Sequence, residues 1–337
     1  MPPVAVTMGD PAGVGLDLVI EALRRPTSPT RVPFILIGDP DVLRQRAHQL
    51  GRAIEVTRLA PDKWDLTPSG ELAVVPVSCR ALVVPGHPDP ANAEATIAAI
   101  ELGACLVKSG RVSALVTNPI AKRVLIAAGF PHPGHTDFLG ELANRHWGQD
   151  YRPVMMLASP ELRVVPVTVH IPLSKVPSSL SQGLIIDTAR TTAAALTGDF
   201  GIARPRIAVC GVNPHAGEGG LIGVEEQTLI APAIDVLRKE GLSIAGPFSA
   251  DSLFHADARR RYDAVLAMYH DQALIPLKTL AFDHGVNVTL GLPFVRTSPD
   301  HGTAFDIAGS GRASASSFLA ALAVAEDIAR RRAGRAA

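Results

Sequence analysis

Three of the eleven histidines follow short, buried-type apolar runs of the sequence. Each comes within a few residues of the end of one run: His170 after 164–169, His215 after 207–210 and His270 after 264–268. If these runs are parallel strands, their carboxyl ends meet at one edge of the sheet, where ligands bind in open α/β folds. Three neutral imidazoles with an open coordination position describe a catalytic divalent-metal site, which can polarise an alcohol or carbonyl oxygen. No compact motif such as HExxH is present, so uncoordinated loop or core histidines stay open as the alternative.

Two acidic residues accompany these histidines. Asp271 adjoins His270, and Asp251 lies in the tripeptide Ala-Asp-Ser at 250–252. Either carboxylate could orient a ligand histidine or act as a general base, and solvated loop acids are the alternative interpretation.

A second set of residues suits an anionic ligand. It combines charged and neutral hydrogen-bond donors: His135, Thr136, Lys278, Asn287 and Arg296. A phosphate needs several converging donors, and arginine supplies a fork while lysine supplies a point charge. Taken singly, each residue is explained as a surface or capping residue, so the prediction of an anion site depends on their joint occurrence.

Two glycine-rich loops could be cofactor loops. They are MGDPAGVG at 8–15 and HAGEGG at 215–220. Neither fits GxGxxG or GxxxxGK[ST], and tight turns explain the glycines about as well as contact with a nucleotide does. The residues alone therefore predict a metal site and an anion site, and they assign no cofactor-binding residue.

The elements that would position these groups alternate along the chain. Short β-branched runs alternate with longer helical patterns rich in alanine and leucine, which is typical of an α/β fold with a mostly parallel sheet. The predicted strands are residues 4–7, 34–37, 114–117, 154–157, 164–169, 207–210 and 264–268, and the clearest helices are residues 92–108 and 317–332. The polar, turn-rich segment 61–70 predicts a surface loop.

Composition limits the class of protein. With 337 residues, 47% of them hydrophobic and 19% charged, the chain can fill a substantial core in two lobes. Basic and acidic residues number 32 each, so no bulk charge draws the chain to nucleic acid or to an anionic membrane. No signal peptide or membrane-spanning segment is evident. The three cysteines, Cys79, Cys105 and Cys210, are far apart and odd in number, so we expect a reducing, cytoplasmic compartment.

Long ordered motifs make the chain resemble the 4-hydroxythreonine-4-phosphate dehydrogenase family of pyridoxal 5′-phosphate biosynthesis over nearly its whole length. They are GDPAGVG at 9–15, GHTDF at 134–138, NPHAGEGG at 213–220, AMYHDQ at 267–272, GVNVTLGLPFVRTS at 285–298 and DHGTAFDIAG at 300–309. The resemblance implies a two-domain α/β/α subunit of the isocitrate and isopropylmalate dehydrogenase type, which binds NAD without the usual fingerprint. We expect one discontinuous domain of residues 1–130 plus 300–337. A second, of residues 131–299, would carry most metal and substrate residues and the dimer contact.

The same resemblance implies an activity and a set of roles. The reaction would be oxidation of 4-phosphooxy-L-threonine at C3 with NAD or NADP, followed by decarboxylation to 3-amino-2-oxopropyl phosphate. The active sites of a homodimer would lie at the subunit interface, with His170, His215 and His270 from both subunits binding zinc, magnesium or cobalt. The residues that align with substrate-contacting positions are His135, Thr136, Lys278, Asn287 and Arg296. The general base stays open among Asp251, Asp271 and Lys278.

Other functions stay open at this point. A dehydrogenase of the same build could act on 4-phospho-D-threonate or 4-phospho-D-erythronate in sugar-acid catabolism, because no motif distinguishes an amino group from a hydroxyl at C2. The phosphate-suited residues argue against the cis-dihydrodiol of terephthalate, on which a relative acts. An acyl- or phosphotransferase of this fold and a non-catalytic binding protein are alternatives of another class, and the three histidines argue against the transferase.

Overall fold

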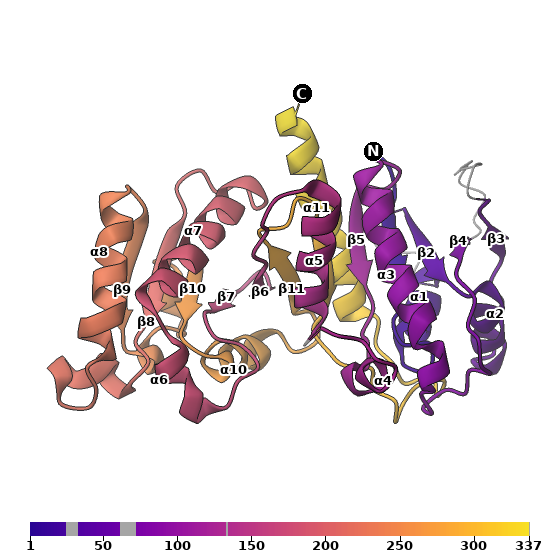
Figure 1. The fold of residues 1–337 in the computed structure, drawn as a ribbon, viewed down its shortest axis with the longest axis horizontal. Coiled ribbons are helices and arrows are strands. Elements are labelled where there is room, and N and C mark those ends of the chain that lie inside the picture. The colour runs from indigo at the N-terminus through magenta and orange to yellow at the C-terminus, as the bar shows by residue number, and fades with distance from the viewer. Residues whose placement is uncertain (25–32, 61–71, 133, 337) are drawn as a thin grey trace. The chain divides into compact units, whose positions relative to one another are not determined.

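The chain folds into two compact units in the computed structural model, which describes residues 1–24, 33–60, 72–132 and 134–336 (Figure 1). The first unit comprises Met1–Pro153 and Leu292–Arg330, and the second comprises Val154–Gly291 and Arg331–Ala337. The predicted surface loop at 61–70 lies outside the described residues.

The first unit is built on a parallel sheet with the strand order β3-β4-β2-β1-β5-β12. Its strands are β1 (Val4–Thr7), β2 (Phe34–Gly38), β3 (Val56–Arg58), β4 (Leu72–Pro76), β5 (Ala114–Thr117) and β12 (Arg296–Pro299). Its helices are α1 (Gly15–Leu23), α2 (Pro40–Gln49), α3 (Ala93–Lys108), α4 (Lys122–Ala127), α5 (His135–Trp147) and most of α11 (Ser316–Ala336). A buried apolar cluster that includes Ile37, Ile100 and Leu115 forms the core of this unit.

The second unit has a mixed sheet with the order β11-β6-β7-β10-β8-β9. Its strands are β6 (Val154–Ala158), β7 (Arg163–Pro166), β8 (Arg206–Cys210), β9 (Ser243–Phe248), β10 (Ala264–Ala267) and β11 (Val286–Leu290). Its helices are α6 (Val176–Ser179), α7 (Gln182–Gly198), α8 (Ala231–Lys239), α9 (Ala256–Arg259) and α10 (His270–Ala281). Strands β7, β10, β8 and β9 are parallel, whereas β6 is antiparallel to both of its neighbours. The carboxyl ends of β7, β10 and β8 therefore lie at one edge.

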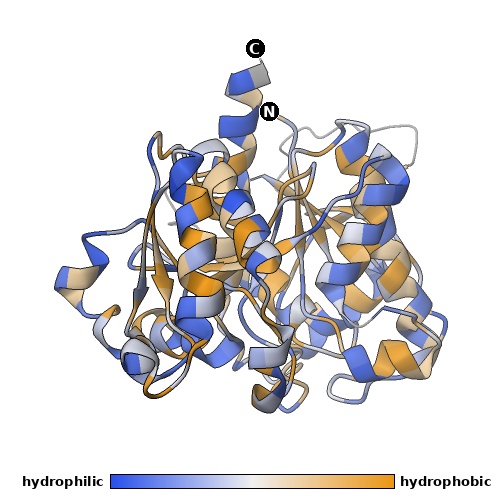
Figure 2. Cartoon of the chain, turned by 60° about the vertical axis from the view of Figure 1, so that its left-hand side comes forward, coloured by the Kyte–Doolittle hydropathy of each residue, from blue (hydrophilic) through white to orange (hydrophobic). Residues whose placement is uncertain are grey.

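Helix starts and helix faces follow from the local sequence. Asp39 caps α2, because its carboxylate accepts the backbone N–H of Asp41 at 2.9 Å and of Val42 at 3.2 Å. Ser181 caps α7 through the N–H of Leu184 at 3.1 Å. Figure 2 shows hydrophobic residues along the strands and on one side of the longer helices, and this is the side that an amphipathic helix buries. No helix in the described part of the chain is long and apolar enough to cross a membrane.

The predicted α/β class with mostly parallel strands is confirmed. Residues 4–7 and 114–117 match β1 and β5 at both ends. The run 164–169 differs most, because regular pairing in β7 ends at Pro166. The strands that the sequence did not predict are β3, β4, β9, β11 and β12.

The compact units differ in extent from the expected domains. Residues 131–153 belong to the first unit, because α5 places Phe138 and Leu142 in the core cluster of that unit. Residues 292–299 also belong to it, since β12 pairs with β5. The predicted substrate residues are therefore divided: His135, Thr136 and Arg296 lie in the first unit, and Lys278 and Asn287 lie in the second.

Candidate functional site

Arg296, Thr117 and His135 form a buried cluster in the first unit. Arg296 begins β12 and is only 3% exposed. Its Nε and Nη2 atoms both donate to Oγ1 of Thr117, the last residue of β5, at 3.0 and 2.6 Å. Nη2 also lies 3.3 Å from Nδ1 of His135. Burial lowers the pKa of Arg296 to about 9, so the guanidinium is still charged at neutral pH.

His135 presents a donor that has no protein partner in the described part of the chain. Burial, with a smaller contribution from the charge of Arg296, lowers the pKa of its imidazole well below the usual value. The neutral ring accepts from Arg296 at Nδ1 and therefore carries its proton on Nε2. Nε2 is buried and has no hydrogen-bond partner among the described residues. A buried N–H without a partner is costly, and an anionic ligand oxygen would satisfy it.

The start of α5 adds further donors beside His135. No side chain caps this helix at Gly134, so the first N–H groups of α5 have no partner within the helix. Thr136 is the second residue of α5 and brings a hydroxyl to the same turn. The positive end of the helix dipole also favours an anion here. We refer to Thr117, His135 and Arg296 as the anion cluster.

His170 and His270 come together in the second unit. His170 follows β7 and His270 is the first residue of α10, just after β10, so parallel pairing of the two strands places both at one edge. Their ring centroids are 5.5 Å apart. Nδ1 of His270 lies 2.7 Å from Oδ1 of Asp271, which leaves Nε2 for a ligand. A carboxylate on the far nitrogen is the usual arrangement around a metal-binding imidazole.

His215 lies in a left-handed stretch of backbone after β8. Residues 215–219 all have positive φ values, between 45° and 79°. Three of them, His215, Ala216 and Glu218, are not glycine, and each costs about 1–2 kcal/mol in this conformation. Strain of this kind persists only where surrounding bonds hold it, and it clusters at functional sites. Nδ1 of His215 lies 2.9 Å from Oε2 of Glu218, which again leaves Nε2 for a ligand.

Within one chain, two of the three candidate histidines lie close enough together to bind one divalent cation, and the third lies apart from them. Among the described residues, no group of three His, Cys, Asp or Glu side chains is arranged to hold a metal ion. The structure brings His170 and His270 together, whereas His215 has Glu218 and Asp251 as its charged neighbours. Imidazole nitrogen is a ligand for zinc, cobalt and nickel, so the pair fits part of such a site.

The two acidic candidates for the general base are already engaged. Asp251 accepts a short hydrogen bond from the hydroxyl of Ser249. This bond, with a smaller contribution from His215, lowers the pKa of the Asp251 carboxyl, which makes the carboxylate a weaker base. Asp271 is bonded to His270 and therefore serves that ring in the structure.

Lys278 and Asn287 are the predicted substrate residues of the second unit. Lys278 lies about two turns after Asp271 on the same face of α10, and its Nζ is 6.0 Å from the ring centroid of Phe282. Asn287 lies in β11, and its Oδ1 is buried without a hydrogen-bond partner in the described part of the chain. This amide oxygen can therefore accept a hydrogen bond from a ligand.

Sequence reasoning missed four residues that hold these groups: Thr117, Glu218, Glu226 and Gln272. Gln272 joins the ends of two strands, because its Oε1 accepts the N–H of Met268 at 2.7 Å and its Nε2 donates to the carbonyl of Gly211 at 2.8 Å. Gln272 and Glu218 could have been predicted, because each lies two or three residues after a candidate ligand histidine. Thr117 gave no such signal, since 179 positions separate it from Arg296.

The first glycine-rich loop is fixed by a buried ion pair. Arg46 on α2 bonds Asp17 on α1 and donates to the carbonyl of Gly13 at 2.9 Å. Asp17 also accepts the N–H of Gly309 at 2.7 Å. These bonds tie the loop to α2 and to the 300–309 segment. These contacts position the loop, and the cofactor-binding residues stay unassigned.

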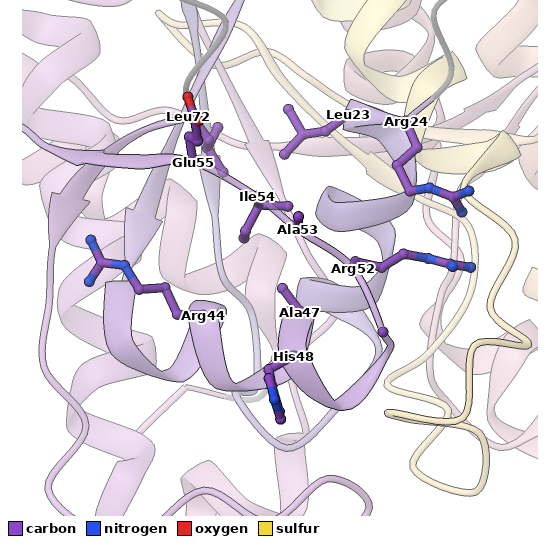
Figure 3. Close-up of a pocket in the computed structure, with 11 residues that line it drawn as sticks. Leu23, Arg24, Arg44, Ala47, His48, Arg52, Ala53, Ile54, Glu55 and Leu72 are labelled. Atoms are coloured by element: carbon purple, nitrogen blue, oxygen red, sulfur yellow. The ribbon is translucent and has the colours of Figure 1, made fainter.

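A cavity of about 730 Å³ lies elsewhere in the first unit, near the starts of β3 and β4 (Figure 3). Ala47, Ile54 and Leu72 supply part of its apolar lining. Its arginines pair with carboxylates of α1 and α2: Arg24 and Arg52 with Glu21, and Arg44 with Asp41. The cavity contains none of the predicted site residues, and each of its arginines already pairs with a carboxylate, so we do not take it as the candidate site.

Comparison with known proteins gives consistent results along the chain. The sequence profile of the PdxA family, described as pyridoxal phosphate biosynthetic protein PdxA, matches residues 30–325. A 4-hydroxythreonine-4-phosphate dehydrogenase of Methylorubrum extorquens is 51% identical over 331 residues, which cover 98% of this chain and 95% of that protein.

Two solved structures illustrate the range of similar folds. The 4-hydroxythreonine-4-phosphate dehydrogenase of Klebsiella pneumoniae has a TM-score of 0.85 and 36% identity, and the match covers 98% of this chain and all of that one (100%). A terephthalate 1,2-cis-dihydrodiol dehydrogenase of Burkholderia xenovorans LB400 has a TM-score of 0.63 and 29% identity, over 97% of this chain and 98% of the other. The dihydrodiol enzyme is thus the more distant of the two in both sequence and structure.

Proposed function

The chain belongs to the PdxA family of pyridoxal phosphate biosynthetic proteins, and from this premise we propose that it is a dehydrogenase of 4-hydroxythreonine 4-phosphate. It oxidises the C3 hydroxyl of 4-phosphooxy-L-threonine with NAD, and the 3-oxo acid then loses carbon dioxide to give 3-amino-2-oxopropyl phosphate. The observation that carries this proposal is the anion cluster, where a buried guanidinium lies beside an unpartnered imidazole N–H.

The anion cluster would bind the phosphate of the substrate. The guanidinium of Arg296 provides the charge, Nε2 of His135 provides a directed N–H, and Thr136 adds its hydroxyl at the start of α5. Because Arg296 and Nε2 of His135 are buried, the hydrogen bonds from these two groups to a phosphate would be strengthened. Lys278 and Asn287, to which the family resemblance gives a substrate-binding role, complete the proposed set. Fixing the phosphate would also fix C3 relative to the cofactor.

The reaction assigns different tasks to the groups of the site. When bound, a divalent cation (zinc, magnesium or cobalt) supplies positive charge beside the reacting oxygens, and NAD or NADP takes the hydride. His170, His215 and His270 would hold that cation. The proton of the hydroxyl needs a base, and we keep Asp251, Asp271 and Lys278 as the candidates. The position of Asp271 beside His270 favours an orienting role for Asp271 over a role as base.

We also propose that the active enzyme is a cytoplasmic homodimer whose sites combine histidines from both subunits. Two imidazoles of one chain converge while the third lies apart, so a partner chain can supply what is missing. Exposed apolar residues follow each candidate ligand in the sequence: Ile171 and Leu173, Leu221 and Val224, and Ile275 and Phe282. Leu221 is 87% exposed and Phe282 is 76% exposed, which suits a face that a second copy covers.

The test of the activity is NADH formation by chelator-stripped protein. The protein would be offered 4-phosphooxy-L-threonine, 4-phospho-D-threonate and 4-phospho-D-erythronate in turn, with and without added divalent metal. We expect metal-dependent turnover with a strong preference for the amino acid. Preference for a sugar-acid phosphate would support the metal-dependent dehydrogenase reaction but change the proposed substrate. No NADH with any of the three would overturn the proposed activity.

A further inference from the structure

A buried carboxylate, that of Glu226, lies against the loop that carries His215. Glu226 is 3% exposed and begins a short π-helical turn, Glu226–Ile230, that leads into α8. Its Oε1 accepts the backbone N–H groups of Val212 and Asn213, both at 2.8 Å. Its Oε2 accepts Nδ2 of Asn213 at 3.0 Å. One side chain therefore satisfies three donors at the start of the loop.

The loop is shaped around this carboxylate. A Cβ atom at Gly211 would lie 2.9 Å from Oε1 of Glu226, and a Cβ atom at Gly217 would lie 2.6 Å from Oε2. Both glycines are buried, and between them the backbone enters the left-handed stretch that begins at His215. On the other side, Gln272 donates to the carbonyl of Gly211. The start of the loop is thus held by an acceptor and a donor from two different helical segments.

From these contacts we propose that Glu226 is a positioning residue for His215, an inference that rests on the proposed role of His215 as a metal ligand. The left-handed conformation at His215, Ala216 and Glu218 is unfavourable by itself, so bonds from outside the loop must hold it. Glu226 provides three bonds of this kind at the start of the loop. His215 is thereby kept in the orientation in which its Nε2 is free.

The chemistry requires a carboxylate at this position. All three groups that face Glu226 are N–H donors, and a carboxylate is purely an acceptor. A glutamine would keep one acceptor but would direct an NH2 group at one of these donors. The substitution Glu226→Gln therefore keeps the volume of the side chain and removes the match in hydrogen bonding.

The experiment measures zinc affinity of the stripped, full-length protein by competition with a chelating dye. We expect Glu226→Gln to weaken zinc binding by about 10- to 100-fold, which is the usual effect of losing a group that orients a ligand. The matched control is Glu225→Gln, because Glu225 is adjacent and bonds the same Asn213 side chain but does not bond the backbone of 212 and 213. This control should keep the zinc affinity of the unchanged protein.

Two further measurements separate positioning from general stability. Amide exchange of the stripped Glu226→Gln protein should be faster in residues 211–220, with little change in the strands. In a His215→Ala background, which retains the His170 and His270 pair, Glu226→Gln should weaken zinc binding no further. Unchanged zinc affinity in Glu226→Gln, or an equal loss of affinity with and without His215, would overturn the positioning role of Glu226. Neither result would affect the proposed ligand set. Unchanged zinc affinity in His215→Ala would instead overturn the proposed ligand set.

Discussion

The anion cluster of the first unit and the histidine loops of the second are built from different kinds of structure. Thr117 and Arg296 belong to paired strands, His135 begins a long helix, and the polar groups of the cluster are buried. His170 and His215, in contrast, lie in loops beyond the strand ends, and both are exposed. One region is preformed by the core of its own unit, and the other leaves its ligands accessible.

This difference indicates which part of the site depends on association. A cluster carried by strands and a helix has its geometry fixed when the unit folds. His170 and His215 lie in exposed loops beyond the strand ends, where an ion or a second chain can reach them. We therefore expect substitutions in the anion cluster to act on substrate binding within one subunit. Substitutions of the histidines should affect metal sites that two subunits share.

The largest expected effect comes from mixing two inactive variants. His215→Ala and His270→Ala should each lose at least about 100-fold in turnover, because a misplaced cation forfeits several kcal/mol of transition-state stabilisation. If each site takes His215 from one subunit and His270 from the other, a mixed dimer contains one intact site. Co-refolding equal amounts should restore about a quarter of normal activity, as expected for random pairing of symmetric dimers.

Mixing His170→Ala with His270→Ala is the matched control for this complementation. These two histidines lie together in one chain, so no pairing of these variants regenerates a complete site. Recovery in this control, or failure of the first mixture to recover activity, would contradict the proposed sharing between subunits. Circular dichroism of each variant checks that the loss is not a loss of fold.

The next largest effect is expected from Arg296→Lys. Lysine keeps the charge but loses the fork that bonds Thr117 and approaches His135. Loss of hydrogen bonds to a charged group costs about 1.5–3 kcal/mol, so KM for the phosphorylated substrate should rise about 10- to 100-fold with a smaller change in kcat. Arg163→Lys, at a half-buried arginine of the second unit, is the control. An equal rise in KM for both variants would remove the phosphate role from Arg296.

Asp271→Asn should affect metal affinity rather than the chemical step. If Asp271 orients His270, asparagine weakens zinc binding about 10- to 100-fold, and saturating zinc restores most of the turnover. Titration of activity against zinc in the variant measures both quantities. A low kcat at saturating zinc, with normal zinc affinity, would instead identify Asp271 as the base.

Strands made only of buried apolar residues could be predicted from the sequence. Strands β1 and β5 consist of apolar and β-branched residues that are buried at every position, so their limits were evident. β12 was missed because it reads Arg-Thr-Ser-Pro, and only the completed fold shows that these polar residues are buried. The same burial makes Arg296 a functional candidate. A buried polar strand is thus harder to predict from the sequence, but its burial in the structure indicates a candidate functional residue.

The residues that hold the histidine loops could not be predicted from the sequence, and the reason differs from that for β12. Local propensity disfavours positive φ at His215, Ala216 and Glu218, so the left-handed turn exists only because distant bonds support it. Glu226 directly follows Glu225 in the sequence, and no spacing to a candidate ligand marks it. The histidines themselves are predicted as ligands because each follows an apolar strand, which is a local pattern.

The smallest expected effect, that of Thr117→Val, tests whether the anion cluster is as rigid as its burial indicates. Valine has nearly the shape of threonine but cannot accept the two bonds from Arg296. Loss of this support costs about 1 kcal/mol, so kcat/KM should fall about 5-fold through KM. Steady-state kinetics with the phosphorylated substrate measures this. A loss as large as that of Arg296→Lys would mean that Thr117 fixes the guanidinium almost alone, whereas no loss would mean that the surrounding core holds Arg296 without it.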